Sequence, residues 1–121
     1  MEKGKIKSFT DLIAWKEAHK LAILIYEITK FFPKEEIYGL TNQIRRAVVS
    51  VSSNIAEGFS RRTNADKNQF YHQSLASLTE LQNQLLIARD VGYLKKEDFN
   101  RATEQTIVVS KLVNSLIKYV S

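Results

Sequence analysis

The sequence contains no cysteine. This excludes a disulfide framework and a thiolate metal site, and it fits a reducing compartment. Long apolar runs are also missing, since the longest, at residues 21–28, is eight residues long and contains Glu27. A membrane-spanning helix needs about 20 predominantly apolar residues. We therefore expect neither secretion nor membrane insertion, and we expect a cytoplasmic location.

Proline and glycine are scarce, with one proline and four glycines in 121 residues. Pro33 is expected to end a first helix, because proline disfavours helical geometry in the residue before it. Gly58 and Gly92 each follow a helical pattern, at positions where glycine most easily forms a left-handed cap. These breaks divide the chain into four helical segments.

The remaining signals define where the helices begin. Asp11 is expected to cap the first helix, and Thr63, with Asp66 three residues later, forms a capping-box pattern before the third. No useful run alternates apolar and polar residues as a strand does. The sequence predicts helices at about residues 12–32, 36–57, 64–91 and 96–120.

Apolar residues along the last two predicted helices recur at spacings of three and four, as in a heptad seam. The seam of the fourth helix is Phe99, Ala102, Thr106, Val109, Val113, Leu116 and Val120, and that of the third is Tyr71, Ser74, Leu78, Leu81, Leu85 and Ala88. Short connections make consecutive amphipathic helices antiparallel neighbours. We predict an all-α fold, an up-down-up-down antiparallel four-helix bundle, as one domain at residues 11–121 after a basic tail at residues 1–10.

Some apolar residues of the last two helices lie outside these seams. They are Leu75, Leu86, Ile107, Val108 and Leu112. Part of this excess widens the side that faces the core. The rest favours a homo-oligomer over a monomer, because contiguous exposed apolar patches usually mark interfaces.

Groups that carry out catalysis or bind metals are sparse. Neither His19 nor His72 belongs to a Glu-x-x-His pair, and neither has an arginine in the seven preceding residues, as a class of helical ribonucleases would. A P-loop, a dinucleotide fingerprint and a nucleophile elbow are also missing. We predict a protein that is not an enzyme and that needs no metal or cofactor.

Positive charge is better organised, within a net charge of +5. Arg45 and Arg46 lie on the second predicted helix, while Arg61, Arg62 and Lys67 flank the start of the third. The free N–H groups of a helix start also favour anions, so phosphate could bind there. Three aromatic residues nearby could stack on unpaired bases: Phe59, Phe70 and Tyr71. The alternative is a solvated turn whose aromatic residues close the end of the bundle.

The second predicted helix also carries a polar stripe. Its members recur at spacings of three and four, and small serines thicken it: Gln43, Arg46, Ser50, Asn54 and Glu57. Serine and asparagine are mediocre helix formers, so their concentration within a helix needs a reason. We interpret the stripe as a packed polar contact, within the bundle or between subunits, rather than as a ligand site.

Four segments of the chain form a distinctive set. They are Phe9, Thr10, Asp11, Leu12 and Trp15 near the start, Gln43, Ile44, Arg45, Arg46 and Ala47, then Asn54, Ile55, Ala56, Glu57 and Gly58, and later Gly92, Tyr93 and Leu94. Together these segments resemble the four-helix proteins encoded in intervening sequences of 23S ribosomal RNA genes. The resemblance extends from about Phe9 to Val120. It implies a bacterial four-helix bundle that forms ring-shaped homo-oligomers, typically pentamers.

A relative of that family is the accessory variability protein of diversity-generating retroelements, which is basic and binds its reverse transcriptase and nucleic acid. The resemblance thus makes Arg45, Arg46, Arg61 and Arg62 candidates for a surface that binds RNA or DNA. The leading hypothesis is a non-enzymatic oligomeric module that binds nucleic acid through a basic face. The alternative is a protein–protein scaffold or accessory subunit whose charge is incidental.

Overall fold

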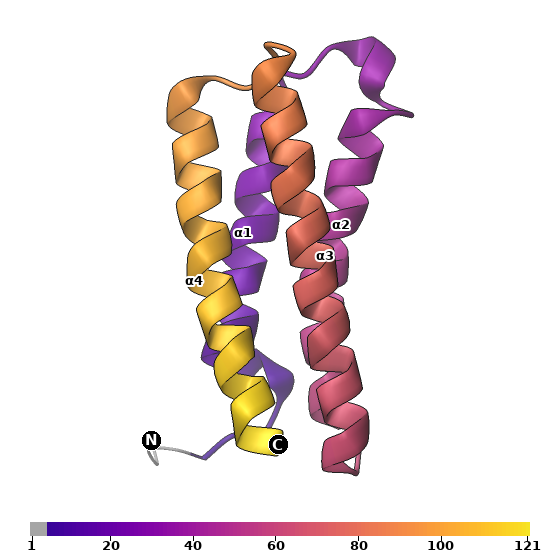
Figure 1. Cartoon of the computed structure of the whole chain (residues 1–121), viewed down its shortest axis with the longest axis vertical. Coiled ribbons are helices and arrows are strands. Elements are labelled where there is room, and N and C mark those ends of the chain that lie inside the picture. Colours follow the sequence, from indigo (N-terminus) through magenta and orange to yellow (C-terminus); the bar gives the residue numbers. More distant parts are fainter. Residues whose placement is uncertain (1–4) are drawn as a thin grey trace.

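The computed structural model describes residues 5–121 and consists of four long helices linked by short connections. The elements are η1 (Phe9–Asp11), α1 (Ile13–Thr29), η2 (Lys34–Glu36), α2 (Leu40–Ser60), α3 (Asn64–Asp90) and α4 (Lys96–Val120), where η denotes a 3-10 turn. Figure 1 shows the helices side by side, each running opposite to the one before it. The described residues contain no strand, and the predicted all-α four-helix bundle is confirmed.

The predicted seams of α3 and α4 face the core. All six seam residues of α3, from Tyr71 to Ala88, are buried. In α4, Val109 and Val113 are fully buried, while Phe99 and Leu116 are partly buried and pack against the core. Within residues 5–121, no helix combines the length and the apolar character that crossing a membrane requires.

The first two helices are shorter at the Pro33 end than predicted. α1 ends at Thr29, three residues early, although Phe32 remains buried. α2 begins at Leu40, because Glu36 lies in η2 and its carboxylate accepts the Leu40 N–H at 3.0 Å. The predicted start at residue 36 is therefore wrong.

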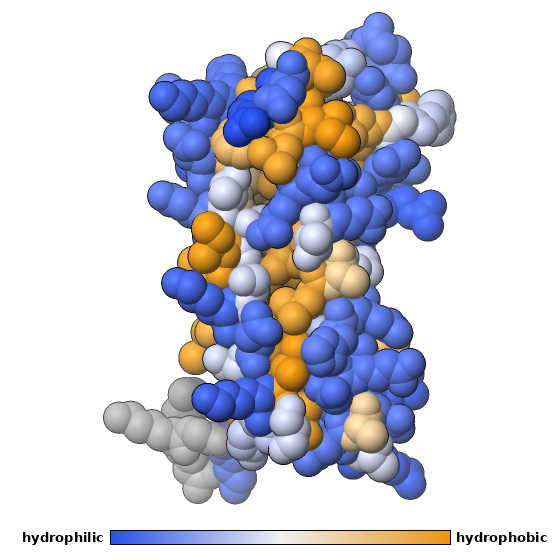
Figure 2. All heavy atoms as spheres, in the orientation of Figure 1, coloured by the Kyte–Doolittle hydropathy of each residue, from blue (hydrophilic) through white to orange (hydrophobic). Residues whose placement is uncertain are grey.

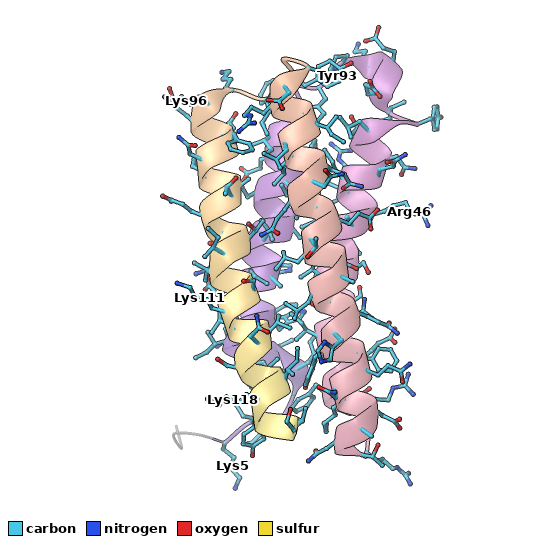
Figure 3. The ribbon with its side chains drawn as sticks, in the orientation of Figure 1. Lys5, Arg46, Tyr93, Lys96, Lys111 and Lys118 are labelled. Atoms are coloured by element: carbon cyan, nitrogen blue, oxygen red, sulfur yellow. The ribbon has the colours of Figure 1, made fainter. Side chains whose placement is uncertain are left out.

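The same carboxylate ties two distant connections together. The Tyr93 hydroxyl, from the turn between α3 and α4, donates to Glu36 Oε2 at 2.9 Å, and Figure 3 labels this tyrosine at that end of the bundle. The Leu40 N–H and the Tyr93 hydroxyl lower the pKa of Glu36. The carboxylate in turn raises the pKa of Tyr93. The Glu36 carboxylate therefore ties the start of α2 to the turn between α3 and α4.

Helical structure begins inside the segment predicted as a tail. The Asp11 carboxylate accepts the N–H groups of Lys7 and Ser8 at 2.9 and 3.1 Å and so caps the start of η1. The prediction that Asp11 caps α1 is wrong, since α1 starts after Leu12 without a side-chain cap. Lys3 of the predicted tail lies outside the described residues.

Gly58 does not end α2, because the helix continues past it and Gly58 occupies a buried position. A Cβ atom there would lie 2.6 Å from Tyr71 Cε1 of α3. Glycine is needed for this close approach of two helices, not for a left-handed turn. Gly92 has the predicted left-handed conformation, with a φ of +86°. The predicted capping box before α3 is only half formed: Thr63 accepts the Asp66 N–H at 3.1 Å, but among the described residues the Asp66 carboxylate does not accept the Thr63 N–H.

The apolar residues outside the seams divide into two groups. Leu75 and Leu112 pack against the core, whereas Leu86, Ile107 and Val108 are between 40 and 45% exposed. Figure 2 shows apolar residues along the line between α3 and α4 and at the end of the bundle where these helices join. The three exposed residues, Leu86, Ile107 and Val108, are therefore available for contact with another molecule.

Candidate nucleic-acid interface

The five basic residues predicted to contact nucleic acid lie at the two ends of α2. Arg45 and Arg46 are near its start, and Arg61, Arg62 and Lys67 surround the turn into α3. Arg61 lies sixteen positions after Arg45, which is about 24 Å along a helix. The five predicted residues therefore form two separate basic groups, one at each end of α2.

Arg45 is held in place by α1. Its Nε donates to Thr29 Oγ1 at 2.9 Å, and its guanidinium lies 4.7 Å from the centre of the Tyr26 ring. The Thr29 hydroxyl in turn donates to the Ile25 carbonyl at 2.7 Å. Arg45 is thus a partly buried cation in a fixed orientation, with some of its N–H donors left for a ligand.

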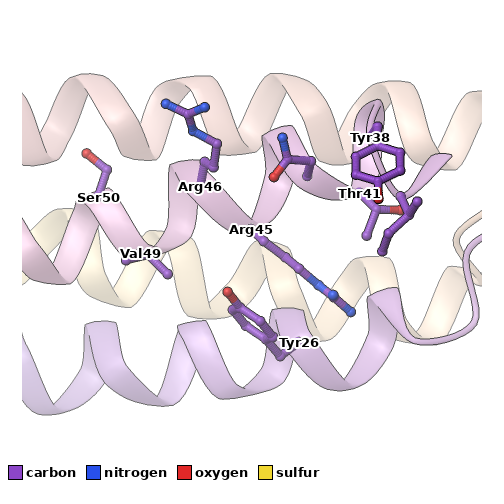
Figure 4. Close-up of a pocket in the computed structure, with 9 residues that line it drawn as sticks. Tyr26, Tyr38, Thr41, Arg45, Arg46, Val49 and Ser50 are labelled. Carbon is purple, nitrogen blue, oxygen red and sulfur yellow. The ribbon is translucent and has the colours of Figure 1, made fainter.

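Arg46, the next residue, leaves α2 on a different side. Figure 4 shows Arg45 directed along α1 and Arg46 directed away from it. Arg46 is exposed and forms no hydrogen bond or ion pair within residues 5–121. In Figure 3 it projects from the opposite edge of the bundle to Lys96 and Lys111 of α4.

Two hollows flank Arg46. The first hollow, of about 800 Å³, opens between α1 and α2, and its lining includes Tyr26, Ile37, Tyr38, Arg45 and Val49. The second hollow, of about 450 Å³, opens between α2 and α3, and its lining includes Gln43, Ser77 and Glu80. Tyr38, Asn42, Arg46 and Ser50 border both hollows.

The second basic group lies at the turn between α2 and α3. Arg61 lies over the Phe70 ring at 4.4 Å, with its Nη2 3.8 Å from Glu57 Oε2. Arg62 is exposed and has no hydrogen-bond or ion-pair partner among the described residues. Tyr71 is buried in the core, where burial raises the pKa of its hydroxyl. Of the aromatic residues predicted to stack on bases, Tyr71 is therefore not accessible and Phe70 is covered by Arg61.

Lys67 is used within the protein. Its Nζ donates to the Phe59 carbonyl at 2.6 Å and lies 3.4 Å from the Gly58 carbonyl, at the end of α2. It also lies 5.4 Å from the centre of the Phe59 ring. Cationic side chains near a helix C-terminus satisfy its last carbonyls, so we assign Lys67 a structural role.

Lys67→Met should lower the free energy of unfolding by about 1 kcal/mol, because it removes the donor for these carbonyls. Arg62→Met removes the same charge from an exposed position and should change stability by less than about 0.5 kcal/mol. Urea denaturation followed by circular dichroism measures both values. Equal effects of the two variants would contradict the structural role of Lys67.

The polar stripe of α2 has two environments. Ser50 Oγ lies 2.8 Å from Ser77 Oγ of α3, and Asn54 Nδ2 donates to Ser50 Oγ at 3.0 Å. These residues lie in the contact between α2 and α3. Gln43 is exposed beside the second hollow, and Glu57 is exposed beside Arg61.

Tyr26, Tyr38 and Glu80 are not among the predicted site residues. Tyr38 is 93% exposed in the segment just before α2, and its position near Arg45 and Arg46 in the sequence was a usable signal. Tyr26 and Glu80 belong to α1 and α3, so only the packing of these helices brings them beside α2. No short motif indicates this arrangement.

Neither histidine belongs to a reactive cluster among the described residues. His19 stacks on Trp15 with ring centres 4.8 Å apart, and His72 is exposed. Residues 5–121 contain no group of three or more histidine, cysteine, aspartate or glutamate residues that could hold a metal ion.

Comparison with known proteins identifies the family. The model of the 23S rRNA-intervening sequence protein family matches residues 10–115. The chain belongs to this family. A search of the curated proteins finds no match.

A solved structure supports the fold of this family member. It is a protein of unknown function from the S23 ribosomal protein family of Bacteroides thetaiotaomicron, and it matches with a TM-score of 0.81 and 22% sequence identity. The alignment covers 88% of this chain and 96% of that chain. At this identity, the similarity shows a shared four-helix fold and nothing about ligands.

Proposed function

We propose that this family member is a non-enzymatic homo-oligomer that binds nucleic acid through the α2 basic face, defined as Arg45, Arg46, Arg61 and Arg62. The supporting observation is the local charge. Residues 40–67 contain five basic and two acidic residues, so they carry +3 of the net +5 of the chain. Arg46 and Arg62 have no partner among the described residues, which leaves two cations in each subunit free for phosphate.

The cationic groups have the chemistry that phosphate needs. Arginine presents a planar fork of N–H donors that bind phosphate oxygens in pairs. Arg45 and Arg61 lie over aromatic rings, and Arg45 is also held by Thr29, so Arg45 loses little side-chain freedom on binding. Between the two basic groups, α2 contains one acidic residue, Glu57, and Arg61 lies beside it. A phosphate backbone following α2 therefore meets little repulsion from α2 itself.

We also propose self-association as a pentamer in the cytoplasm, where the absence of cysteine is ordinary. The exposed Leu86, Ile107 and Val108 supply apolar surface for contact between copies. Native mass spectrometry at micromolar concentration should give a mass several times 13.9 kDa. A monomer at that concentration would rule out this part of the proposal.

Symmetry increases the charge that a nucleic acid meets, because a closed ring repeats one patch around its axis. A ring of about five subunits would carry roughly +25, given +5 for each chain. Affinity for RNA or DNA should therefore fall steeply with salt. Each phosphate contact contributes about −0.9 on duplex and −0.7 on single strands to the slope of log affinity against log salt.

The variant Arg46→Gln, Arg62→Gln should flatten this slope, because it removes the two unpaired cations. The matched control is Lys111→Gln, Lys118→Gln, which removes the same charge from α4 (Figure 3) and should leave the slope nearly unchanged. Fluorescence anisotropy across a salt series measures both slopes. Equal flattening by the two variants would mean that net charge, not the α2 basic face, controls binding.

The alternative function is a protein–protein scaffold, favoured by the same exposed apolar residues. It predicts no binding of the intact oligomer to RNA or DNA at about 50 mM salt, where phosphate contacts are strong. The salt series therefore distinguishes the two candidates. If the arginine variant loses folding or assembly as well as binding, those arginines are structural.

A further inference from the structure

We propose that the start of α2 binds two consecutive unpaired nucleotides, with the phosphate between them on Arg46 and one base in each flanking hollow. This inference rests on the proposed nucleic-acid function and adds the form of the ligand. Nucleotides in a duplex hide their faces against neighbouring bases, whereas unpaired nucleotides can be splayed apart and stacked on side chains. Arg46 lies between two hollows of different chemistry, and this arrangement suits unpaired nucleotides rather than a duplex.

The first hollow suits the face of a base. Tyr38 is 93% exposed at its rim, and Ile37 and Val49, which are 48 and 43% exposed, give it apolar walls. Bases stack on aromatic side chains in single-strand-binding proteins. Arg45 lies over one face of Tyr26, and Tyr26 is 40% exposed against 93% for Tyr38, so Tyr38 is the more accessible ring for stacking.

The position of Arg46 determines where the phosphate of the proposed ligand would bind. Arg46 borders both hollows, and Arg45, the adjacent cation, is fixed by Thr29 at 2.9 Å on the side of the first hollow. A phosphate on Arg46 therefore leaves its two nucleosides free to enter the hollows on opposite sides. Figure 4 shows these side chains diverging from α2.

The second hollow suits the edge of a base rather than a phosphate. Glu80 lines it and would repel an anion, and Gln43 and Ser77 add neutral polar groups. Gln84, which is almost wholly buried, donates from Nε2 to Glu80 Oε2 at 3.2 Å and so restrains this carboxylate. A carboxylate accepts N–H donors, and guanine carries two adjacent ones on its Watson–Crick edge. We infer a preference for guanine in this hollow.

The direct test uses fluorescein-labelled decamers, each a run of uridine with one central guanosine, as RNA and as the DNA counterpart. The same DNA strand in a blunt duplex and an all-uridine decamer complete the set. The parent should bind the single strand about tenfold more tightly than the duplex. Glu80→Gln should abolish the preference for the guanosine-containing decamer over all-uridine.

Tyr38→Ala should weaken single-strand binding about tenfold and leave duplex binding unchanged, because it removes a stacking ring. Tyr38→Phe keeps the ring and should bind as the parent does. Tyr119→Ala is the matched control, since Tyr119 is 87% exposed on α4, and it should have no effect. Thermal unfolding of each variant confirms that it is folded, as expected for such exposed positions.

The outcomes separate this inference from the proposed function. If no nucleic acid binds, both fail. If single strand and duplex bind equally and Tyr38→Ala changes neither, the α2 basic face stands but the two-nucleotide site is wrong. If the parent binds single-stranded RNA, single-stranded DNA or both, and Tyr38→Ala weakens that binding, the two-nucleotide site is supported. The strand that binds also identifies whether the site accepts RNA, DNA or both.

Discussion

Val109→Asp should strongly destabilise the subunit, whereas Val108→Asp, one residue earlier on α4, should leave the subunit folded and act only on contact between copies. Val109 is fully buried in the α4 seam, and Val108 is 40% exposed. A carboxylate at position 109 would be buried without a partner, or would have to be protonated there, and either state is costly. We expect the free energy of unfolding of the subunit to fall by about 4–5 kcal/mol in Val109→Asp and by less than about 1 kcal/mol in Val108→Asp.

The pair controls for composition, since both variants exchange one valine for one aspartate on the same helix. Urea denaturation followed by circular dichroism compares their midpoints with that of the parent. The seam of α4 is assigned incorrectly if Val109→Asp unfolds at the midpoint of the parent. The same conclusion follows if Val108→Asp is the more damaging change.

Gly58→Ala should be the second most damaging change, although alanine is the better helix former. Its Cβ would lie 2.6 Å from Tyr71 Cε1 and 2.9 Å from Tyr71 Cδ1. Both are ring atoms of a buried side chain, so α2 and α3 must separate or the ring must move. Overpacking of this kind costs typically 1–3 kcal/mol, which outweighs the roughly 1 kcal/mol that alanine gains over glycine within a helix.

A double-mutant cycle with Tyr71→Leu identifies the source of this cost. The leucine lacks the ring atoms that meet the new Cβ, so Gly58→Ala should be less harmful in that background. Ser53→Ala, at an exposed position of α2, is the control and should be neutral or slightly stabilising. Additive effects of Gly58→Ala and Tyr71→Leu would show that the contact with Tyr71 is not the cause.

Much of the fold was predictable because the seams of α3 and α4 have a regular period. Val109 and Leu81 occupy positions that spacing alone identifies as core, and both are fully buried. The ends of helices were harder, since they depend on contacts across the chain. Glu36 accepts hydrogen bonds from Leu40 and from Tyr93, and the second residue is 57 positions away.

The candidate site was only partly predictable. The basic residues are visible in the sequence, but whether each cation is free depends on packing. Lys67 binds the last carbonyls of α2, and Arg45 is held by Thr29, while Arg46 beside it has no partner within residues 5–121. Equal charges in the sequence therefore have different roles. The hollows on either side of Arg46 come from three helices and have no local signature.

The role of Gly58 also could not be predicted from the local sequence. A glycine after a helical run favours a left-handed cap, and Gly92 has that conformation with a φ of +86°. Gly58 instead lies inside α2 against Tyr71. The two roles have the same local pattern, and only the approach of a second helix separates them.

Ultraviolet cross-linking of the oligomer to a uridine-rich single strand, with the attached peptides identified by mass spectrometry, tests whether nucleic acid lies along the α2 basic face. We expect cross-links at Tyr38 and at residues flanking Arg46 and Arg62, and none on α4 around Lys111. Cross-links confined to α4, or none from an oligomer shown to be intact, would contradict this placement.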